Sequence, residues 1–471
     1  MFETVIGVEV HFELATATKL YCSCPNIFGA VPNTYCCPVC AGMPGALPVL
    51  NRRAVEYAVM SGLALGCNIN SPTAFDRKNY FYPDMPNGYQ LSQLYTPICT
   101  DGKVAFSLNG EQRNVRIREI HLEDDAGKLI HNGNDTKVDY NRAGVPLIEV
   151  VTQPDMRSAE EVAAFLEELR LIIGYIGVSD CKMQEGSMRV DVNLSVRREG
   201  EPLGTRTEMK NLNSLKAVMH AVRCESARQI SVIESGGSVE QQTRRFDDVR
   251  GVSTVMRDKE NADDYRYFPE PNIPPIEITE DIISSAEKLL PELPDSRRKR
   301  YVSDFSLSSA DAQVLTADRS IADFFERTVA ICGDAREAAN RITGDIMREM
   351  NERGCGLSDA AVTPEKLARI IVLCSSGVIN RSASRELINA AFADDIDIDA
   401  YIAQHELAQI TDSDIIRDAV RQVIDDNPRP VADFRSGKSK AFGNIVGMAM
   451  KKLNGRADPA LVNKCVDNML K

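Results

Sequence analysis

The sequence predicts an α+β protein in which a mixed, largely antiparallel-sheet domain is followed by an all-α helical domain and a small helical tail domain. Strand-like alternation dominates the first 290 residues or so, whereas helical spacing of apolar residues takes over after about residue 295. A proline cluster between Pro269 and Pro294 separates the two patterns. We expect the three domains to span residues 1–292, 293–398 and 399–471.

The first domain combines strands with a few clear helices. In the segment Arg157–Gly177, apolar residues recur at helical spacing, and Ser158 and Glu161 form a capping-box pattern at its start. A second helix is expected from Leu215 to Ser235, where two glycines end it. The strands are expected at Phe2–Leu14, Val115–Leu122, Val145–Val151 and Met188–Val196.

The second half of the chain is predicted to be helical. Helical spacing continues through segments near 309–352 and 363–391. The acidic stretch Asp394–Asp399 then separates these segments from a last helical piece, which places a domain boundary near residue 398.

Composition narrows the class of protein. Hydrophobic residues make up 43% and charged residues 26% of the 471 residues, as in soluble globular chains. No signal peptide and no apolar run of membrane-spanning length is found, so we expect no membrane contact. Thirteen cysteines without a signal peptide indicate reduced thiols in a cytoplasmic protein. The net charge of −13 argues against a protein that coats nucleic acid without specificity. It does not exclude a protein that binds RNA through a local basic patch.

Several common nucleotide and nucleophile motifs are absent. The sequence contains no P-loop, no dinucleotide fingerprint and no nucleophile elbow. If ATP is used, its phosphates must therefore be held by side chains and Mg²⁺. The segment FDRKNYFYPDMPNGYQLSQ at 75–93 mixes aromatic and charged residues and is interrupted by prolines. It is either a loop that grips a polar ligand or a loop that its aromatic residues anchor to the core.

Four cysteines have the spacing of a metal site. Cys22 and Cys24 form C-x-C, and Cys37 and Cys40 form C-x-x-C after twelve further residues. Two thiolate pairs brought together by one loop match a tetrahedral structural zinc site. Cys36 could take the place of Cys37, and buried free cysteines are the alternative interpretation.

Carboxylates and histidines lie on three expected strands. Glu9 and His11 are two residues apart and so share one face of their strand. Beyond His121 come three acidic residues, Glu123, Asp124 and Asp125, and Glu149 interrupts an apolar run. Buried carboxylates are costly unless paired or bound to a cation. The three strands could therefore converge on Mg²⁺, which prefers oxygen ligands and substrate phosphates; ordinary salt bridges are the alternative.

The segments at 186–197 and 204–211 predict a charged wall made of two adjacent strands. The first presents Arg189 and Asp191 on the face opposite its apolar residues, and the second presents Glu208 and Lys210. Such a wall could hold a nucleotide or an acyl group, or it could be a solvated antiparallel face.

The last 36 residues are basic. They contain seven basic and two acidic residues, on a chain that is acidic as a whole. This tail could lie along an RNA backbone and read its shape, or it could be a solvated lysine-rich helix. Its candidate RNA contacts are Lys438, Lys440, Lys451 and Lys452.

Taken together, the motifs resemble one family. The segments GVEVH at 7–11, FDRKNYFYPDMPNGYQLSQ at 75–93, HLEDDAGKLIH at 121–131, DYNRAGVPLIEVV at 139–151, KMQEGSMRVDVNLSVR at 182–197 and DYRYFPEP at 264–271 resemble the B subunit of the aspartyl/glutamyl-tRNA amidotransferase, in order and across the whole first domain. The helical region and the segment GKSKAFGNIVGMAMKK resemble the helical and tail domains of that family.

The resemblance implies a ligase that acts within a complex of three different proteins. The A subunit would be an amidase that releases ammonia from glutamine, and the C subunit would be a small belt that joins the other two. The B subunit would use ATP to activate the side-chain carboxylate of Glu-tRNA(Gln), Asp-tRNA(Asn) or both. Ammonia would then displace the phosphate and give Gln-tRNA(Gln) or Asn-tRNA(Asn).

The resemblance also implies roles for individual residues. The Mg²⁺ cradle would be Glu9, His11, Glu123, Asp124 and Glu149, with Lys78 in the polar lining where ammonia enters. The family usually reads Glu-Glu-Asp at 123–125, so the shorter Asp124 is expected to coordinate through a water molecule. Arg189, Asp191, Glu208 and Lys210 would contact ATP or the acyl end. All four cysteines of the zinc motif are present. The basic tail would dock on the outer corner of tRNA.

Two other functions remain open on the residues alone. One is a stand-alone metal-dependent enzyme, such as a hydrolase, that uses the same carboxylate–histidine cluster. The other is a non-catalytic RNA-binding adaptor that uses only the tail. A reaction that requires both ATP and charged tRNA would separate the amidotransferase from both.

Overall fold

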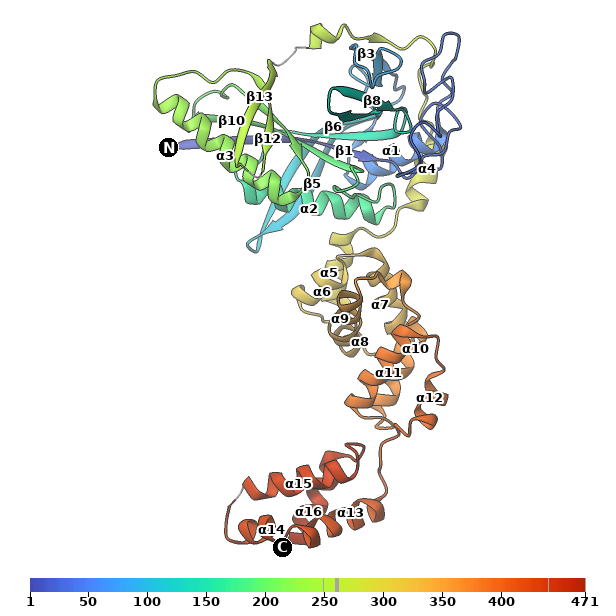
Figure 1. Ribbon diagram of the computed structural model, residues 1–471, viewed down its shortest axis with the longest axis vertical. Coiled ribbons are helices and arrows are strands. Elements are labelled where there is room, and N and C mark those ends of the chain that lie inside the picture. The colour runs from blue at the N-terminus through green and yellow to red at the C-terminus, as the bar shows by residue number, and fades with distance from the viewer. Residues whose placement is uncertain (249, 259–261, 439, 471) are drawn as a thin grey trace. The chain divides into compact units, whose positions relative to one another are not determined.

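The computed structural model describes residues 1–248, 250–258, 262–438 and 440–470 (Figure 1). It forms two compact units, Met1–Leu293 and Pro294–Lys471. The first is built on sheets and the second on helices, so the predicted α+β class is confirmed. The further division of the helical part near residue 398 stays a prediction, and Lys471, counted above in the basic tail, lies outside the described residues.

The first unit is organised around a nine-stranded sheet, counted over the described residues. Neighbouring strands are antiparallel except β11 and β12, which pair in parallel. Across the sheet, the strands are β13 (Val252–Asp258), β12 (Gln242–Asp247), β11 (Thr207–Leu212), β10 (Met188–Arg198), β1 (Phe2–Glu13), β9 (Pro146–Thr152), β6 (Glu111–Asp124), β5 (Cys99–Leu108) and β2 (Asn68–Ile69).

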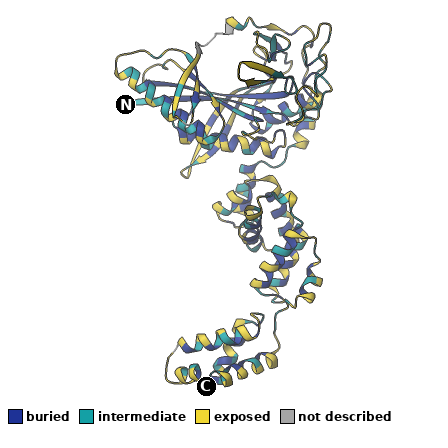
Figure 2. Ribbon diagram, viewed as in Figure 1, coloured by how far each residue is buried: buried dark blue, intermediate teal, exposed yellow. Residues whose placement is uncertain are grey.

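Helices cover one face of this sheet. Figure 1 shows α2 (Ala159–Tyr175) and α3 (Leu215–Glu234) lying beneath the strands, with α1 (Arg52–Ala64) and α4 (Glu280–Leu289) nearby. Alternate residues of β1, such as Val8, Val10 and Phe12, are buried in the core between the sheet and these helices (Figure 2). Because strand side chains alternate, the polar residues between them face the other side of the sheet.

The predicted capping box at α2 is half formed. The Ser158 hydroxyl accepts the Glu161 backbone N–H at 3.1 Å, as expected of an N-cap residue. The Glu161 carboxylate, however, accepts the backbone N–H of Arg157, one residue before the cap. The helix therefore begins at Ala159, two residues after the expected start.

The segment at 75–93 folds as a short hairpin around its proline-rich turn. Strands β3 (Asp76–Asn79) and β4 (Tyr89–Ser92) pair in an antiparallel manner, and β14 (Phe268–Pro269) adds to β3. The Arg77 guanidinium bonds to buried Glu270 through two nitrogens, at 2.5 and 3.1 Å. A second small sheet pairs β7 (Lys128–Asn132) with β8 (Asp135–Asp139).

Within the second unit, the predicted segment near 309–352 is divided into several helices. A π-helical turn (Ile342–Ile346) joins α8 and α9, and Gly333, with a positive φ of 72°, ends α7. The described helices are α5 (Pro294–Asp304), α6 (Ser309–Leu315), α7 (Arg319–Cys332), α8 (Ala335–Arg341), α9 (Met347–Arg353), α10 (Pro364–Ser375), α11 (Arg381–Ala393), α12 (Ile398–Gln404), α13 (Ser413–Asp426), α14 (Pro428–Arg435), α15 (Lys440–Lys452) and α16 (Pro459–Leu470).

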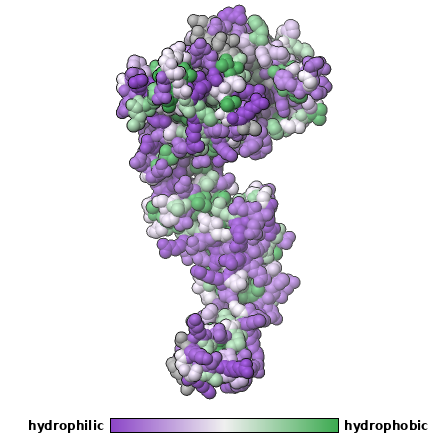
Figure 3. Space-filling view, turned by 60° about the vertical axis from the view of Figure 1, so that its left-hand side comes forward, coloured by the Kyte–Doolittle hydropathy of each residue, from purple (hydrophilic) through white to green (hydrophobic). Residues whose placement is uncertain are grey.

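The tail has its own apolar core. Val420 of α13, Ile445 and Ala449 of α15, and Val462 and Val466 of α16 are fully buried against one another. Among the described helices, none combines the length and the apolar character needed to cross a membrane. Figure 3 shows hydrophilic side chains over most of the visible surface, with apolar residues scattered among them.

Candidate active site

A cavity of about 620 Å³ opens on the face of the sheet opposite the helices. Carboxylates and basic side chains from β1, β3, β6, β9, β10 and β11 line it. Every predicted magnesium, nucleotide and ammonia residue except Asp124 contributes to its wall: Glu9, His11, Lys78, Glu123, Glu149, Arg189, Asp191, Glu208 and Lys210.

Strand register explains why these residues meet. His11 of β1 lies directly opposite Glu149 of β9, and Glu149 in turn lies opposite His121 of β6. On its other side, β1 places Glu9 opposite Asp191 of β10. Residues opposite one another on neighbouring strands have Cβ atoms about 5 Å apart. The antiparallel pairing therefore converts separate sequence motifs into one polar surface.

His11, Glu123 and Glu149 form the first candidate cation site. One ligand atom from each lies within 4.8 Å of the other two. The Nε2 of His11 is 3.3 Å from a Glu123 oxygen and 3.7 Å from a Glu149 oxygen. Both glutamates are buried, so the site concentrates negative charge where water does not screen it.

The pKa values of the two glutamates are shifted in opposite directions. Burial alone would raise the pKa of Glu123, but the hydrogen bond and charge of His11 lower it to about 2. For Glu149, burial dominates and raises the pKa. Burial works in the opposite direction on His11, yet Glu149 and Glu123 raise its pKa to about 9.

His121 belongs to this cluster, although it was not among the predicted site residues. Its Nε2 lies 3.1 Å from a Glu149 oxygen, and its Nδ1 lies 3.1 Å from the Ser92 hydroxyl. The sequence contained the signal, because His121 precedes Glu123 by two residues on one strand and so shares its face.

Asp124 is not brought into the cluster. Its side chain accepts the Leu91 backbone N–H at 2.8 Å and lines a smaller cavity beside the cysteine loop. Burial is the first cause that raises its pKa to about 8. Strand alternation explains why Asp124 does not line the large cavity. Adjacent residues of β6 point to opposite faces, so of Glu123 and Asp124 only Glu123 points into that cavity.

Asp125 lines the cavity in place of Asp124. Its two carboxylate oxygens hold the Arg189 guanidinium at 2.7 and 3.2 Å, and Arg142 approaches the same carboxylate at 3.4 Å. The Nε of Arg189 is buried and has no hydrogen-bond partner among the described residues. The guanidinium groups of Arg142 and Arg189 therefore line the cavity near the cation site, and the Nε–H of Arg189 is available to a ligand.

Glu9, Asp191 and Glu208 form a second group of carboxylates within 4.8 Å. The Lys210 ammonium lies 2.5 Å from an Asp191 oxygen and 3.0 Å from a Glu208 oxygen. Burial alone would lower the pKa of Lys210, but Asp191 and Glu208 outweigh it and raise the value. Three residues of the predicted charged wall, Asp191, Glu208 and Lys210, are therefore joined by ion pairs, whereas Arg189 pairs with Asp125.

Lys78 reaches the cavity from the hairpin strand β3. Its ammonium lies 5.0 Å from the centre of the Tyr265 ring, within the range of a cation–π contact. Burial would lower the pKa of Lys78, but Tyr267, Glu123 and Glu149 raise it, so the side chain stays charged. The aromatic residues of the 264–271 segment thus help to hold a cation at the cavity wall.

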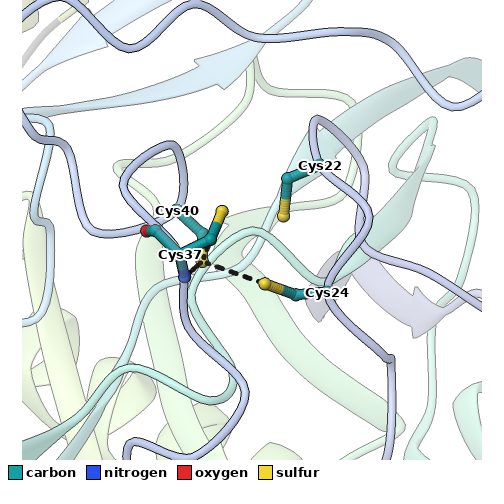
Figure 4. A group of neighbouring side chains, drawn as sticks. All are labelled: Cys22, Cys24, Cys37 and Cys40. Carbon is teal, nitrogen blue, oxygen red and sulfur yellow. Dashed lines mark hydrogen bonds between the residues drawn. The ribbon is translucent and has the colours of Figure 1, made fainter.

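The four predicted cysteines gather beside this region (Figure 4). The Cys40 sulfur is 3.9 Å from the sulfurs of Cys24 and Cys37. A tetrahedral zinc with Zn–S bonds of about 2.3 Å would separate its sulfurs by about 3.8 Å. Cys36 is outside the group, and its sulfur donates to the Asn33 carbonyl instead.

The thiols of this group are electronically unequal. The pKa of Cys40 is lowered to about 4, first by the hydrogen bond from Cys22 and then by the backbone N–H of Cys37 and the charge of Lys19. Thiolates are the form that binds zinc. The donor set, its spacing and this stabilised thiolate all fit a structural zinc site.

The predicted RNA-contacting lysines lie on the surface of the tail. Lys438, Lys440, Lys451 and Lys452 are all exposed. Lys438 pairs with Asp433 at 2.8 Å and Lys452 with Asp426 at 3.7 Å, whereas Lys440 and Lys451 mark the first and the penultimate residues of α15.

Comparison with known proteins covers both units. A family model described as the GatB/GatE catalytic domain matches residues 4–284, and one described as the GatB domain matches residues 323–470. Proteins named as the B subunit of aspartyl/glutamyl-tRNA(Asn/Gln) amidotransferase are similar over the full length. One from Lachnoclostridium phytofermentans is 47% identical over 473 residues, which cover 100% of this chain and 99% of the relative.

Two further relatives with the same name agree. The protein from Lachnospira eligens is 49% identical over 480 residues, covering 100% of this chain and 99% of its own. That from Moorella thermoacetica is 46% identical over 474 residues, covering both chains completely. The resemblance inferred from the motifs is confirmed, and the chain belongs to the family of aspartyl/glutamyl-tRNA(Asn/Gln) amidotransferase B subunits.

Proposed function

We propose that this chain catalyses the ATP-dependent amidation of Glu-tRNA(Gln), Asp-tRNA(Asn) or both, as the B subunit of a complex whose A subunit is an amidase and whose C subunit is small. The proposal rests on the cavity in which His11, Glu123 and Glu149 lie near Arg189 and other basic side chains. A carboxylate is a poor electrophile, so an enzyme that amidates it must first bind phosphates and neutralise their charge.

The chain's own residues fit that task. His11, Glu123 and Glu149 would hold Mg²⁺, which supplies charge neutralisation to the ATP phosphates when bound. Arg189, with its spare buried donor, and Lys210 would orient phosphate oxygens. The acyl carboxylate oxygen attacks the γ-phosphorus and ADP leaves. Ammonia then attacks the carbonyl carbon, and phosphate leaves with the carboxylate oxygen.

Lys78 has a position suited to the second step. Its charged ammonium reaches the cavity from β3, on the hairpin that lines one side. A fixed cation there would favour the negative charge that develops on the carbonyl oxygen as ammonia adds. It would also discourage entry of ammonium, which cannot act as a nucleophile.

We further propose that the cysteine group binds zinc in a structural role. Four thiolates close the coordination shell and leave no position for a substrate. Zinc would fix the loop between β1 and α1, which supplies little regular structure of its own and places Val39 and Leu50 against the main core.

The basic tail is proposed to dock on the tRNA backbone. Replacing Lys438, Lys440, Lys451 and Lys452 by glutamine should weaken tRNA binding about tenfold. The slope of log affinity against log salt should become shallower by about 3, because fewer phosphate contacts release fewer counterions. Fluorescence anisotropy at several salt concentrations measures both. Point changes are preferable to deleting the tail, since deletion would also remove core residues of α15 and α16.

A second quadruple variant controls for net charge. It carries the same substitution at four exposed lysines of the first unit and should keep nearly normal affinity and salt slope. An equal loss in both variants would remove the tail from the RNA footprint. The control set is Lys103, Lys128, Lys137 and Lys216.

The proposed activity is tested by amide formation in the reconstituted complex. The chain is co-expressed with its two partner proteins and given Glu-tRNA(Gln), ATP, Mg²⁺ and an ammonium salt, which bypasses glutamine hydrolysis. Gln-tRNA(Gln) should form only when ATP is present. If it does not, the same assay with Asp-tRNA(Asn) follows; no product from either substrate would contradict the proposal. Turnover without ATP would instead favour a hydrolase.

A further inference from the structure

Lys19 is a lysine buried inside the first unit, with none of its surface exposed. Its ammonium donates to the Cys40 sulfur at 3.5 Å and to the Tyr140 carbonyl oxygen at 3.1 Å. Burying an ammonium is costly unless it is paired with an anion. The Cys40 sulfur would supply that anion once zinc binds it as a thiolate, so the contact ties Lys19 to the proposed zinc site.

Charge explains why a cation belongs at this position. Zinc bound by four thiolates carries a net double negative charge, which is unfavourable around Cys40, the buried member of the group. An ammonium in contact with one thiolate offsets part of that charge and also reduces repulsion among the sulfurs. Hydrogen bonds from such outer groups orient the ligands and tune metal affinity.

The second bond of Lys19 links the cysteine group to the wall of the large cavity. Tyr140 begins the segment 140–144, whose Gly144 backbone bonds to both Leu20 and Asp125, at 2.8 and 2.9 Å. The same segment contains Arg142, which lines the cavity and donates to the carbonyl oxygens of Ala126 and Gly127.

We propose that Lys19 is a positioning residue for this metal site: its ammonium balances the charge of the zinc thiolates and holds segment 140–144 against the cysteine loop. The inference rests on the proposed zinc site. It predicts that Lys19 controls both the lifetime of bound zinc and the order of the segment that carries Arg142.

Zinc release from the full-length chain tests the first part. Zinc content is measured in purified protein, and release into an excess of chelator is followed with a chromogenic zinc indicator. Lys19→Met, which keeps the length but removes the charge and both bonds, should release zinc about 10- to 100-fold faster than the unmodified chain. Lys103→Met, on the exposed face of β5, is the matched control and should be unchanged.

Cobalt substitution gives a readout that a simple loss of packing would not move. With Co²⁺ in the four-thiolate site, the sulfur-to-cobalt charge-transfer band should shift to lower energy in Lys19→Met, because the Cys40 sulfur loses its donor and becomes more electron-rich. Lys19→Gln keeps an amide donor without the charge. If the band shifts as far in Lys19→Gln as in Lys19→Met, the shift is caused by loss of the charge. A smaller shift in Lys19→Gln assigns part of it to loss of the hydrogen bond.

Hydrogen exchange tests the second part. In zinc-loaded protein, the backbone amides of segment 140–144 should exchange faster in Lys19→Met than in the unmodified chain or in Lys103→Met. If Lys19→Met does not fold, Lys19→Gln carries the comparison. Absence of zinc from the unmodified chain would contradict the zinc proposal itself. Normal zinc release, cobalt band and exchange in a zinc-loaded Lys19 variant would overturn the role of Lys19 alone.

Discussion

Replacing Glu149 by glutamine is expected to reduce ammonium-dependent amide formation at least about 1,000-fold, equivalent to about 4 kcal/mol of transition-state stabilisation. Glutamine keeps the size of the side chain but removes the charge that faces both His11 and His121. A cation site left with Glu123 as its one carboxylate should bind Mg²⁺ more weakly, so a higher Mg²⁺ concentration should restore part of the rate. Single-turnover assays over a range of Mg²⁺ measure both effects.

The same variant should keep its affinity for tRNA to within about twofold, because phosphate contacts dominate RNA binding and the proposed ones lie in the tail. Glu119→Gln, on β6 but outside the cavity wall, is the matched control and should retain activity. More than a tenth of normal activity in Glu149→Gln would contradict the assignment of the cation site. Loss of tRNA binding together with activity, in a folded variant, would place RNA contacts in this cavity.

Replacing Asp125 by asparagine is expected to lower kcat/KM for ATP about 100-fold, or about 2.7 kcal/mol. The buried carboxylate of Asp125 holds Arg189 through two charged hydrogen bonds and is approached by Arg142. Asparagine offers one oxygen and no charge, so the two guanidinium groups would repel each other and lose their fixed orientation. The melting temperature should also fall, by an amount that reflects about 2 kcal/mol for the lost charged bonds.

A second aspartate–arginine pair provides the control. Asp155 holds the Arg116 guanidinium through two bonds at 2.6 and 2.9 Å and accepts the Arg116 backbone N–H at 3.0 Å. The arginine side chain is exposed, and the pair is outside the cavity. Asp155→Asn should change kcat/KM by no more than about twofold and stability by less than about 1 kcal/mol. Equal losses in both variants would show that Asp125 acts through general stability and not through the orientation of Arg189.

The sequence could predict elements whose physical cause is local. The apolar spacing in α2 and α3 and the alternation in β1 and β10 result from the geometry of single elements, so their positions were predicted to within a few residues. The cysteine spacing predicted the four-sulfur group for the same reason, since a short loop brings C-x-C and C-x-x-C together. It left Cys36 and Cys37 as alternatives, because no regular alternation fixes which way neighbouring side chains of a loop point.

Pairing between distant strands could not be predicted from the residues alone. That His11 faces Glu149, and Glu149 faces His121, depends on the register of β1, β9 and β6. A shift of one residue would turn every side chain to the other face. Asp124 shows the consequence. Its motif suggested a cation ligand, but its place on β6 directs it to the Leu91 backbone and leaves Asp125 to organise the arginines.

The sequence by itself therefore determined the α+β class, the family, the cysteine group and most of the residues around the cavity, because composition, periodicity and motif spacing are properties of the chain alone. The tertiary structure decided which residues share the cavity: it added His121, Asp125 and Arg142, directed Asp124 away, and buried Lys19 against Cys40. These contacts join residues far apart along the chain, and only strand register and packing bring them within bonding distance.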